Sequence, residues 1–261
     1  MKNFLFIALF LSSFIMFSQG RLEKAKESLS NDTEESETKS TSRKISRNNE
    51  GNGFFVDVFA ELGYYAFYGI VVGRSEYRNI TPYPYYKNLR GEYLKTDFEQ
   101  TKNSLFKISA YQLFNRGVNA LELNANYRVI PILGVEVSHL NFSENSIQGK
   151  QYLDVSSFLL KYYRVREQNI SVWWGAGASY VANGVDTWGL AYTIGTEIFP
   201  AKPISIHLSY KQSFINFSNV NEFKVQLKYH IKKTALVIGY HANAIGSENV
   251  NGIVFGAEYT F

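Results

Sequence analysis

Apolar and polar residues alternate along the second half of the chain. Between residues 119 and 129, every second side chain from Leu121 to Val129 is apolar, while Glu122 and Arg128 fall in the opposite phase. The segments 204–214 and 223–230 repeat this period of two. Successive side chains of a strand point to opposite faces, so the pattern predicts strands with one apolar and one polar face.

The alternation predicts ten strands between residues 104 and 261. Turn residues such as Asn183-Gly184 and Asn251-Gly252 separate them and leave short connections. A tilted strand of about 9–11 residues crosses a bilayer. We therefore predict an all-β fold, an antiparallel up-and-down transmembrane β-barrel of about 10 strands, within a range of roughly 8–12. The expected strands are 105–114, 119–129, 133–142, 152–163, 170–181, 187–199, 204–214, 223–230, 234–244 and 252–261.

The expected strands 133–142 and 152–163 are less regular than the others. Lys161 falls in the same phase as Leu153, Val155 and Leu159. If that apolar phase faces lipid, a lysine does not belong in it, so the pattern predicts a bulge or a slip of phase.

A soluble barrel would alternate in the same way, and composition separates the two cases. The chain has 16% aromatic residues, with 19 Tyr and 20 Phe, and rings recur near the expected strand ends, as at Tyr127, Trp188 and Phe214. Aromatic girdles at both interfaces are typical of outer-membrane barrels. The opposite face carries small residues such as Gly175 and Gly195, which suit a crowded lumen better than a solvent surface.

The N-terminal region predicts three further segments. Residues 1–18 combine Lys2 with two apolar runs and small residues, which indicates a signal peptide cleaved after residue 18 or 20. Residues 21–52 hold seven basic and seven acidic side chains, so 19–52 is expected to be a disordered charged periplasmic linker, with room for a short helix over Leu22–Leu29.

Residues 53–103 form the third segment. A strand over 53–73 would mix rings and acids on one face, whereas a helix places Asp57 and Glu61 in one polar patch, so an amphipathic helix is preferred. Pro82 and Pro84 then argue against long regular elements in the Tyr-rich stretch 74–103.

The last strand carries the strongest single motif. Gly256, Tyr259 and Phe261 fit the pattern Gly-x-x-aromatic-x-aromatic at the end of the sequence. The chain thereby resembles small outer-membrane β-barrels of Gram-negative bacteria, in the OmpA/OmpX-like class, and the outer-membrane barrel proteins of flavobacteria. The resemblance implies location in the cell outer membrane, contact with its lipid, and recognition of the C-terminal motif by the barrel assembly machinery. It implies no activity.

The polar faces of the strands carry the candidate functional residues. Charges on the lipid face would cost about 2–4 kcal/mol each near the midplane, so they are expected in the lumen. The mixture of signs predicts a packed, ion-paired lumen; the alternative is a narrow small-solute pore with weak anion preference, carried by Lys211, Lys224 and Lys228. The expected lumen charges are Lys107, Glu122, Arg128, Glu136, Glu197, His207, Lys211, Lys224, Lys228 and Glu258, with His230 and His241 beside them.

Several other functions find no support in the sequence. The chain has no cysteine, and it lacks the motifs of serine hydrolases, zinc proteases and phosphate-binding loops, so we expect no catalytic residues, metal or cofactor. A net charge of +4 without a basic cluster does not indicate nucleic-acid binding. The expected role is a structural or binding component of the outer membrane, with an unidentified periplasmic partner for the N-terminal tail as a further hypothesis.

Overall fold

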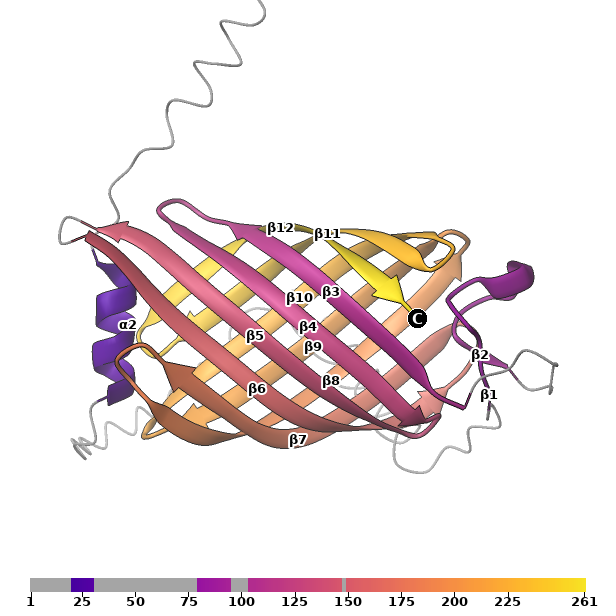
Figure 1. Ribbon diagram of the computed structural model, residues 1–261, viewed down its shortest axis with the longest axis horizontal. Coiled ribbons are helices and arrows are strands. Elements are labelled where there is room, and N and C mark those ends of the chain that lie inside the picture. Colours follow the sequence, from indigo (N-terminus) through magenta and orange to yellow (C-terminus); the bar gives the residue numbers. More distant parts are fainter. Residues whose placement is uncertain (1–19, 31–78, 95–102, 147–148) are drawn as a thin grey trace, which may run out of the picture.

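Ten strands close into an antiparallel barrel in which neighbours along the chain pair and the last strand pairs with the first. The computed structural model describes residues 20–30, 79–94, 103–146 and 149–261 (Figure 1). The predicted fold class and strand number are confirmed. The barrel strands are β3 (Leu105–Phe114), β4 (Val118–Ile130), β5 (Leu133–Ser146), β6 (Gly149–Arg166), β7 (Ile170–Ala182), β8 (Thr187–Ala201), β9 (Ile204–Ile215), β10 (Ser218–Ile231), β11 (Thr234–Ile245) and β12 (Glu248–Thr260).

Three short elements and one helix precede the barrel. Helix α2 (Arg21–Ser30) lies across one mouth, which we call the α2 end (Figure 1). A small hairpin, β1 (Asn79–Ile80) and β2 (Tyr93–Leu94), encloses the 3-10 helix η1 (Tyr86–Asn88) at the other mouth. We call this the terminal end, because β3 begins and β12 ends there. No helix in these described ranges is long and apolar enough to cross a membrane.

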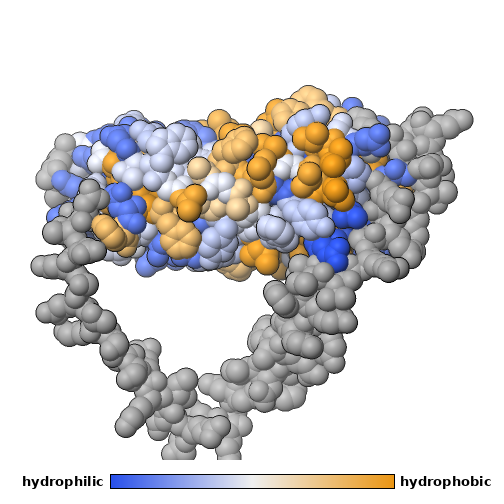
Figure 2. All heavy atoms as spheres, turned by 90° about the horizontal axis from the view of Figure 1, so that it is seen from below, coloured by the Kyte–Doolittle hydropathy of each residue, from blue (hydrophilic) through white to orange (hydrophobic). Residues whose placement is uncertain are grey.

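The outer surface of the barrel is apolar. Aliphatic side chains such as Leu123, Val137 and Ile194 are exposed near the middle of their strands. Rings gather toward both strand ends: Phe106 contacts Tyr127 and Phe261 at the terminal end. At the α2 end the corresponding ring contacts are Tyr180–Trp188 and Phe114–Phe255. Figure 2 shows apolar side chains spread over one side of the wall. An aliphatic band between aromatic girdles is the surface that a bilayer requires.

The interior is not polar along its whole length. Leu153, Val155 and Leu159 are fully buried on the same face of β6 as Lys161, and that face lines the lumen. The expected slip of phase at Lys161 is therefore wrong, because the apolar residues in this part of β6 point inward. A register shift does occur on β6, but between Tyr163 and Val165.

The inward apolar residues form a core at the α2 end. The apolar stripe of α2 packs against them, and Leu22 and Leu29 are fully buried. A helix inside a membrane barrel buries its apolar face only if the wall around it is apolar too, which explains why the inward positions are apolar at this end. The wall residues of this core include Leu113, Val118, Leu140, Phe142, Leu153, Val155, Val181, Ile215, Val220, Ile245, Val250 and Val254.

The predicted N-terminal segments have mixed outcomes. The short helix over Leu22–Leu29 is present, but residues 21–30 pack against the barrel rather than forming a solvated linker. The spacing of Leu22, Ala25 and Leu29 places them on one helical face. That face is buried, although the residues of the segment are on average polar. The signal peptide at 1–18 and the amphipathic helix at 53–73 lie outside the described residues.

Candidate functional site: the charged layer of the lumen

A charged layer fills the lumen between the apolar core at the α2 end and the hairpin at the terminal end. Its six basic and six acidic side chains all lie inside the barrel and are paired with one another. Buried charges are tolerated only when paired and hydrogen-bonded. The layer consists of Lys107, Arg128, Lys161, Lys211, Lys224 and Lys228 with Glu92, Glu122, Glu136, Glu197, Glu222 and Glu258.

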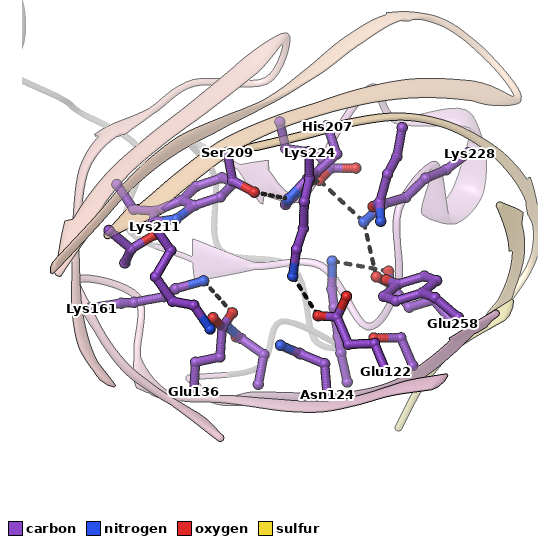
Figure 3. A pocket seen from close by; sticks show the side chains of 18 of the residues that line it. Glu122, Asn124, Glu136, Lys161, His207, Ser209, Lys211, Lys224, Lys228 and Glu258 are labelled. Carbon is purple, nitrogen blue, oxygen red and sulfur yellow. Dashed lines mark hydrogen bonds and ion pairs between the residues drawn. The ribbon is translucent and has the colours of Figure 1, made fainter. Parts of the chain in front are cut away.

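One half of the charged layer centres on β10. Lys224 pairs with Glu122 across the lumen (Figure 3). Lys224 also lies 3.2 Å from Glu222 on its own strand, and Lys211 lies 2.6 Å from Glu222. Lys161 pairs with Glu136 nearby. The three lysines therefore have carboxylate partners from β4, β5 and β10, which ties distant parts of the wall together across the lumen.

The other half centres on Lys228. Its Nζ lies 2.9 Å from Glu258 and 3.3 Å from Glu197. Glu258 also lies 3.4 Å from Lys107, and Glu197 hydrogen-bonds His207 at 2.7 Å and Ser205 at 2.6 Å. This half of the layer lies toward the terminal end.

Helix α2 is fastened to the wall at both of its ends. The Glu144 carboxylate of β5 accepts hydrogen bonds from the backbone nitrogens of Arg21 at 3.1 Å and Leu22 at 2.7 Å. At the other end, Asn216 Nδ2 donates to the Leu29 carbonyl at 2.6 Å. A helix leaves its first N–H groups and last carbonyls unpaired, and here the barrel supplies partners for two of those N–H groups and one of those carbonyls.

Residues 79–94, which we call the hairpin plug, lie at the terminal end (Figure 1). Glu92 reaches into the charged layer and pairs with both Lys107 and Arg128. Burial alone would raise the pKa of Glu92, but the attraction of Arg128 and Lys107 outweighs burial and lowers that pKa below its ordinary value. Tyr93 and Tyr163 lie against the Arg128 guanidinium, with ring centroids 5.2 and 4.4 Å from Cζ.

The rim of the barrel holds the rest of the hairpin plug. The Tyr85 hydroxyl donates to the carbonyls of Ala201, at 3.0 Å, and Ile204. Gly91 adopts φ +72° and lies so close to the wall that an added Cβ would stand 1.8 Å from the Gln168 carbonyl oxygen. Only glycine allows both this backbone conformation and this approach.

The space that remains in the charged layer is small. The cavity measures ≈ 80 Å³, enough for a few water molecules and well below the 300–1,000 Å³, roughly, of ordinary ligand pockets. His207 lies between Glu197 and Ser209, at 2.7 and 3.2 Å, which is the order of groups in a serine hydrolase. A cavity of this size has no room for a typical ester substrate, so the arrangement does not by itself indicate catalysis.

The structure brings all ten sequence-predicted lumen residues into the charged layer or its cavity. His230 and His241 are buried with them. Sequence reasoning missed Glu222, although it continues the inward phase of Lys224 and Lys228 by one step. It also missed Lys161, whose phase was misassigned, and Glu92, which lies in the irregular stretch. No group of three or more residues suited to a metal ion occurs among the described His, Asp and Glu side chains.

The residues of the C-terminal motif lie where the barrel closes. Gly256 faces inward opposite Tyr111 of β3, and Tyr259 is exposed opposite Ile108. The backbone nitrogen of Phe261 donates to the Phe106 carbonyl at 2.9 Å. The motif therefore belongs to the seam between β12 and β3; its role in assembly stays a prediction.

Comparisons with known proteins give fold likeness alone. No family model and no curated protein sequence matches the chain. The structure is similar to the N-terminal β-barrel domain of Pseudomonas aeruginosa OprF, at 10% identity over 61% of this chain and 98% of that domain, with a TM-score of 0.32. It is also similar to Yersinia pestis Ail, at 16% identity over 60% and 98% of the two chains and a TM-score of 0.34. An outer-membrane channel of Pseudomonas putida F1 is 9% identical over 60% and 95% of the two chains, at a TM-score of 0.37.

Proposed function

We propose that this chain is an integral outer-membrane β-barrel whose lumen is closed, and that it acts as a structural or binding component of that membrane. The support for the membrane location is the outer wall, with its aliphatic band and ring-bearing ends. A soluble protein rarely exposes such a continuous apolar surface. The apolar runs at 1–18 favour export, and the motif of Gly256, Tyr259 and Phe261 is proposed as the signal for the barrel assembly machinery.

The single observation that carries the closed lumen is its filling in three successive layers. Helix α2 and the apolar core fill one end, the charged layer fills the middle, and the hairpin plug fills the other end. A solute would have to displace α2 from the apolar core and separate the buried ion pairs of the charged layer, including those with Glu92 of the hairpin plug. Pairs of this kind cost about 3–5 kcal/mol when one partner is removed, so spontaneous opening of the path is rare.

The alternative function is a narrow pore that conducts only when its N-terminal plugs withdraw. It is favoured by one specific observation: α2 and the hairpin plug precede the barrel strands in the chain, so their withdrawal leaves the wall intact. The weak anion preference expected from Lys211, Lys224 and Lys228 has less support, because each lysine has a carboxylate partner.

Conductance in a planar bilayer tests both functions. The refolded mature chain is compared with a chain lacking residues 19–103, and heat-modifiable gel mobility establishes that each is folded. We expect no steady channels from the full chain. Steady channels from the full chain would contradict the closed lumen, and channels that appear only after truncation would assign the N-terminal region as the plug of a pore.

A further inference from the structure

Glu92 differs from the other acids of the charged layer in its origin. The remaining five carboxylates come from barrel strands, as do all six basic groups. Glu92 alone, among the described residues of the layer, comes from the hairpin plug. The barrel wall by itself therefore lacks one negative charge, and the deficit is located at Lys107 and Arg128.

Arg128 and Lys107 form a built site around that carboxylate. Arg128 uses Nη2 for Glu92, and its Cζ lies over the rings of Tyr93 and Tyr163. The Lys107 ammonium approaches the other oxygen of the same carboxylate. A planar guanidinium beside an ammonium is a common arrangement for holding carboxylate or phosphate groups.

The site has unused donor capacity. Arg128 is 4% exposed, yet its Nε and Nη1 have no hydrogen-bond partner in the part of the chain that the structure describes. A buried guanidinium normally satisfies its donors, since each unpaired one costs free energy. The cavity of the charged layer borders both Arg128 and Lys107, but the two unpaired nitrogens are themselves buried, so an anionic group reaches them only when Glu92 leaves.

The carboxylate of Glu92, which occupies the site, belongs to the hairpin plug and not to the barrel wall. The hairpin of β1 and β2 forms its own two-stranded sheet and shares no ladder with the barrel. Its polar contacts with the wall at the rim come mainly from side chains, such as the Tyr85 hydroxyl with Ala201 and the Tyr93 hydroxyl with Pro131. Glu92 is therefore carried by a segment that is not hydrogen-bonded into the sheet of the wall, although Ile80 and Tyr93 of that segment pack against Leu105 of β3.

We propose that Lys107 and Arg128 form an anion-binding site for a small solute bearing a carboxylate or phosphate group, and that Glu92 occupies this site as an intramolecular competitor. The inference deepens the proposed function and rests on its closed terminal end. It assigns the binding role to one place and one chemical class. Binding of such a solute and docking of the hairpin plug exclude each other.

Isothermal titration calorimetry on the refolded full chain in nonionic detergent, at neutral pH and low salt, tests the site. The probes are inorganic phosphate and succinate. We expect weak binding by the wild-type chain, binding at least about tenfold tighter in Glu92→Gln, and loss of that gain when Arg128→Gln is added. Glu136→Gln is the matched control: it removes the carboxylate of another buried pair and frees Lys161 alone, so no gain is expected.

Gly91→Ala gives an independent route to the same state. It keeps every charged residue but forces the hairpin plug away from the Gln168 carbonyl, so it should reproduce the gain of Glu92→Gln.

The proposal is overturned if neither variant binds either probe more tightly, if Arg128→Gln leaves the gain unchanged, or if Glu136→Gln gains equally. Binding of short-chain phosphatidylglycerol without binding of the free probes would overturn the assignment to a solute. Conductance reports on the closed lumen and calorimetry on the site, so the two failures are distinguishable.

Discussion

The Glu144 carboxylate accepts the backbone N–H groups of both Arg21 and Leu22, at 3.1 and 2.7 Å. A strand that lines the lumen thus caps the helix that fills it. The acid is 1% exposed and stands where the helix dipole is positive, so hydrogen bonding and electrostatics act together.

Removal of the Glu144 carboxylate should release α2. In Glu144→Ala the two N–H groups lose their acceptor, at a cost of about 1.5–3 kcal/mol. Trypsin cleavage at the helix should then accelerate by about tenfold to hundredfold. Glu248→Ala is the control, because its contact with Arg21 spans 3.6 Å between side chains that are 23–29% exposed and should matter little. Equal cleavage in the two variants would contradict the capping role.

Gly246→Ala should displace α2 by steric contact. Gly246 has φ +56°, and an added Cβ would stand 1.9 Å from Ser28 Oγ on the helix. Hydrogen exchange in residues 21–30, followed by mass spectrometry, should become faster. Gly149→Ala also places alanine at positive φ, +115°, but meets no atom within 4 Å, so it separates steric contact from backbone strain. Slow exchange in both variants would mean that the turn at residue 246 shifts to make room for the alanine and that α2 stays docked.

The barrel was predictable from sequence because the period of two is a local property. Leu121 to Val129 alternates with Glu122 to Arg128, and such a strand needs no knowledge of its neighbours. The position of the charged layer was predictable from the same alternation. Charged side chains are too costly on the lipid-facing side, so they must face the lumen. Glu222 was not among the predicted lumen residues only because the expected strand, 223–230, begins one residue after it.

The filling of the lumen was not predictable in the same way. Leu153 and Val155 look like lipid-facing residues in sequence, and only the packing of Leu22 and Leu29 against them explains their inward orientation. Glu92 sits in a stretch without periodicity, and its partners are 15 and 36 residues away along the chain. Contacts of this kind depend on the closed barrel, which brings together residues that no local pattern connects.

Breaking one ion pair of the charged layer should destabilise the barrel strongly. Glu222→Gln leaves Lys211 without the carboxylate that lies 2.6 Å from its Nζ, while Lys224 retains Glu122. A buried charge left without its partner costs about 3–5 kcal/mol. Urea unfolding in lipid vesicles, followed by tryptophan fluorescence, should show this loss. The double variant Lys211→Met with Glu222→Leu should recover most of it, and an unchanged midpoint in Glu222→Gln would contradict the pairing.

Leu123→Arg tests the lipid-facing wall. Leu123 lies in the middle of β4 and is 48% exposed, so an arginine there should cost about 2–4 kcal/mol of stability in vesicles. Val129→Arg, at the end of the same strand and 47% exposed, should cost about 0–1 kcal/mol. Equal costs, measured by urea unfolding, would contradict a bilayer around the middle of the wall.

Acid should release the hairpin plug through Glu92. Its pKa is lowered in the docked state, so docking favours the carboxylate: this stabilisation is complete above the ordinary value of 4.5 and is lost as pH falls through the lower pKa of the docked state. A spin label at Lys87→Cys is unique, because the chain has no cysteine. The label should be immobile at neutral pH and become mobile below pH 4.5. In Glu92→Gln that transition should be reduced or absent, because the amide does not titrate and other carboxylates provide the only remaining pH dependence. A transition of the same size in both chains would assign the release to those other carboxylates instead.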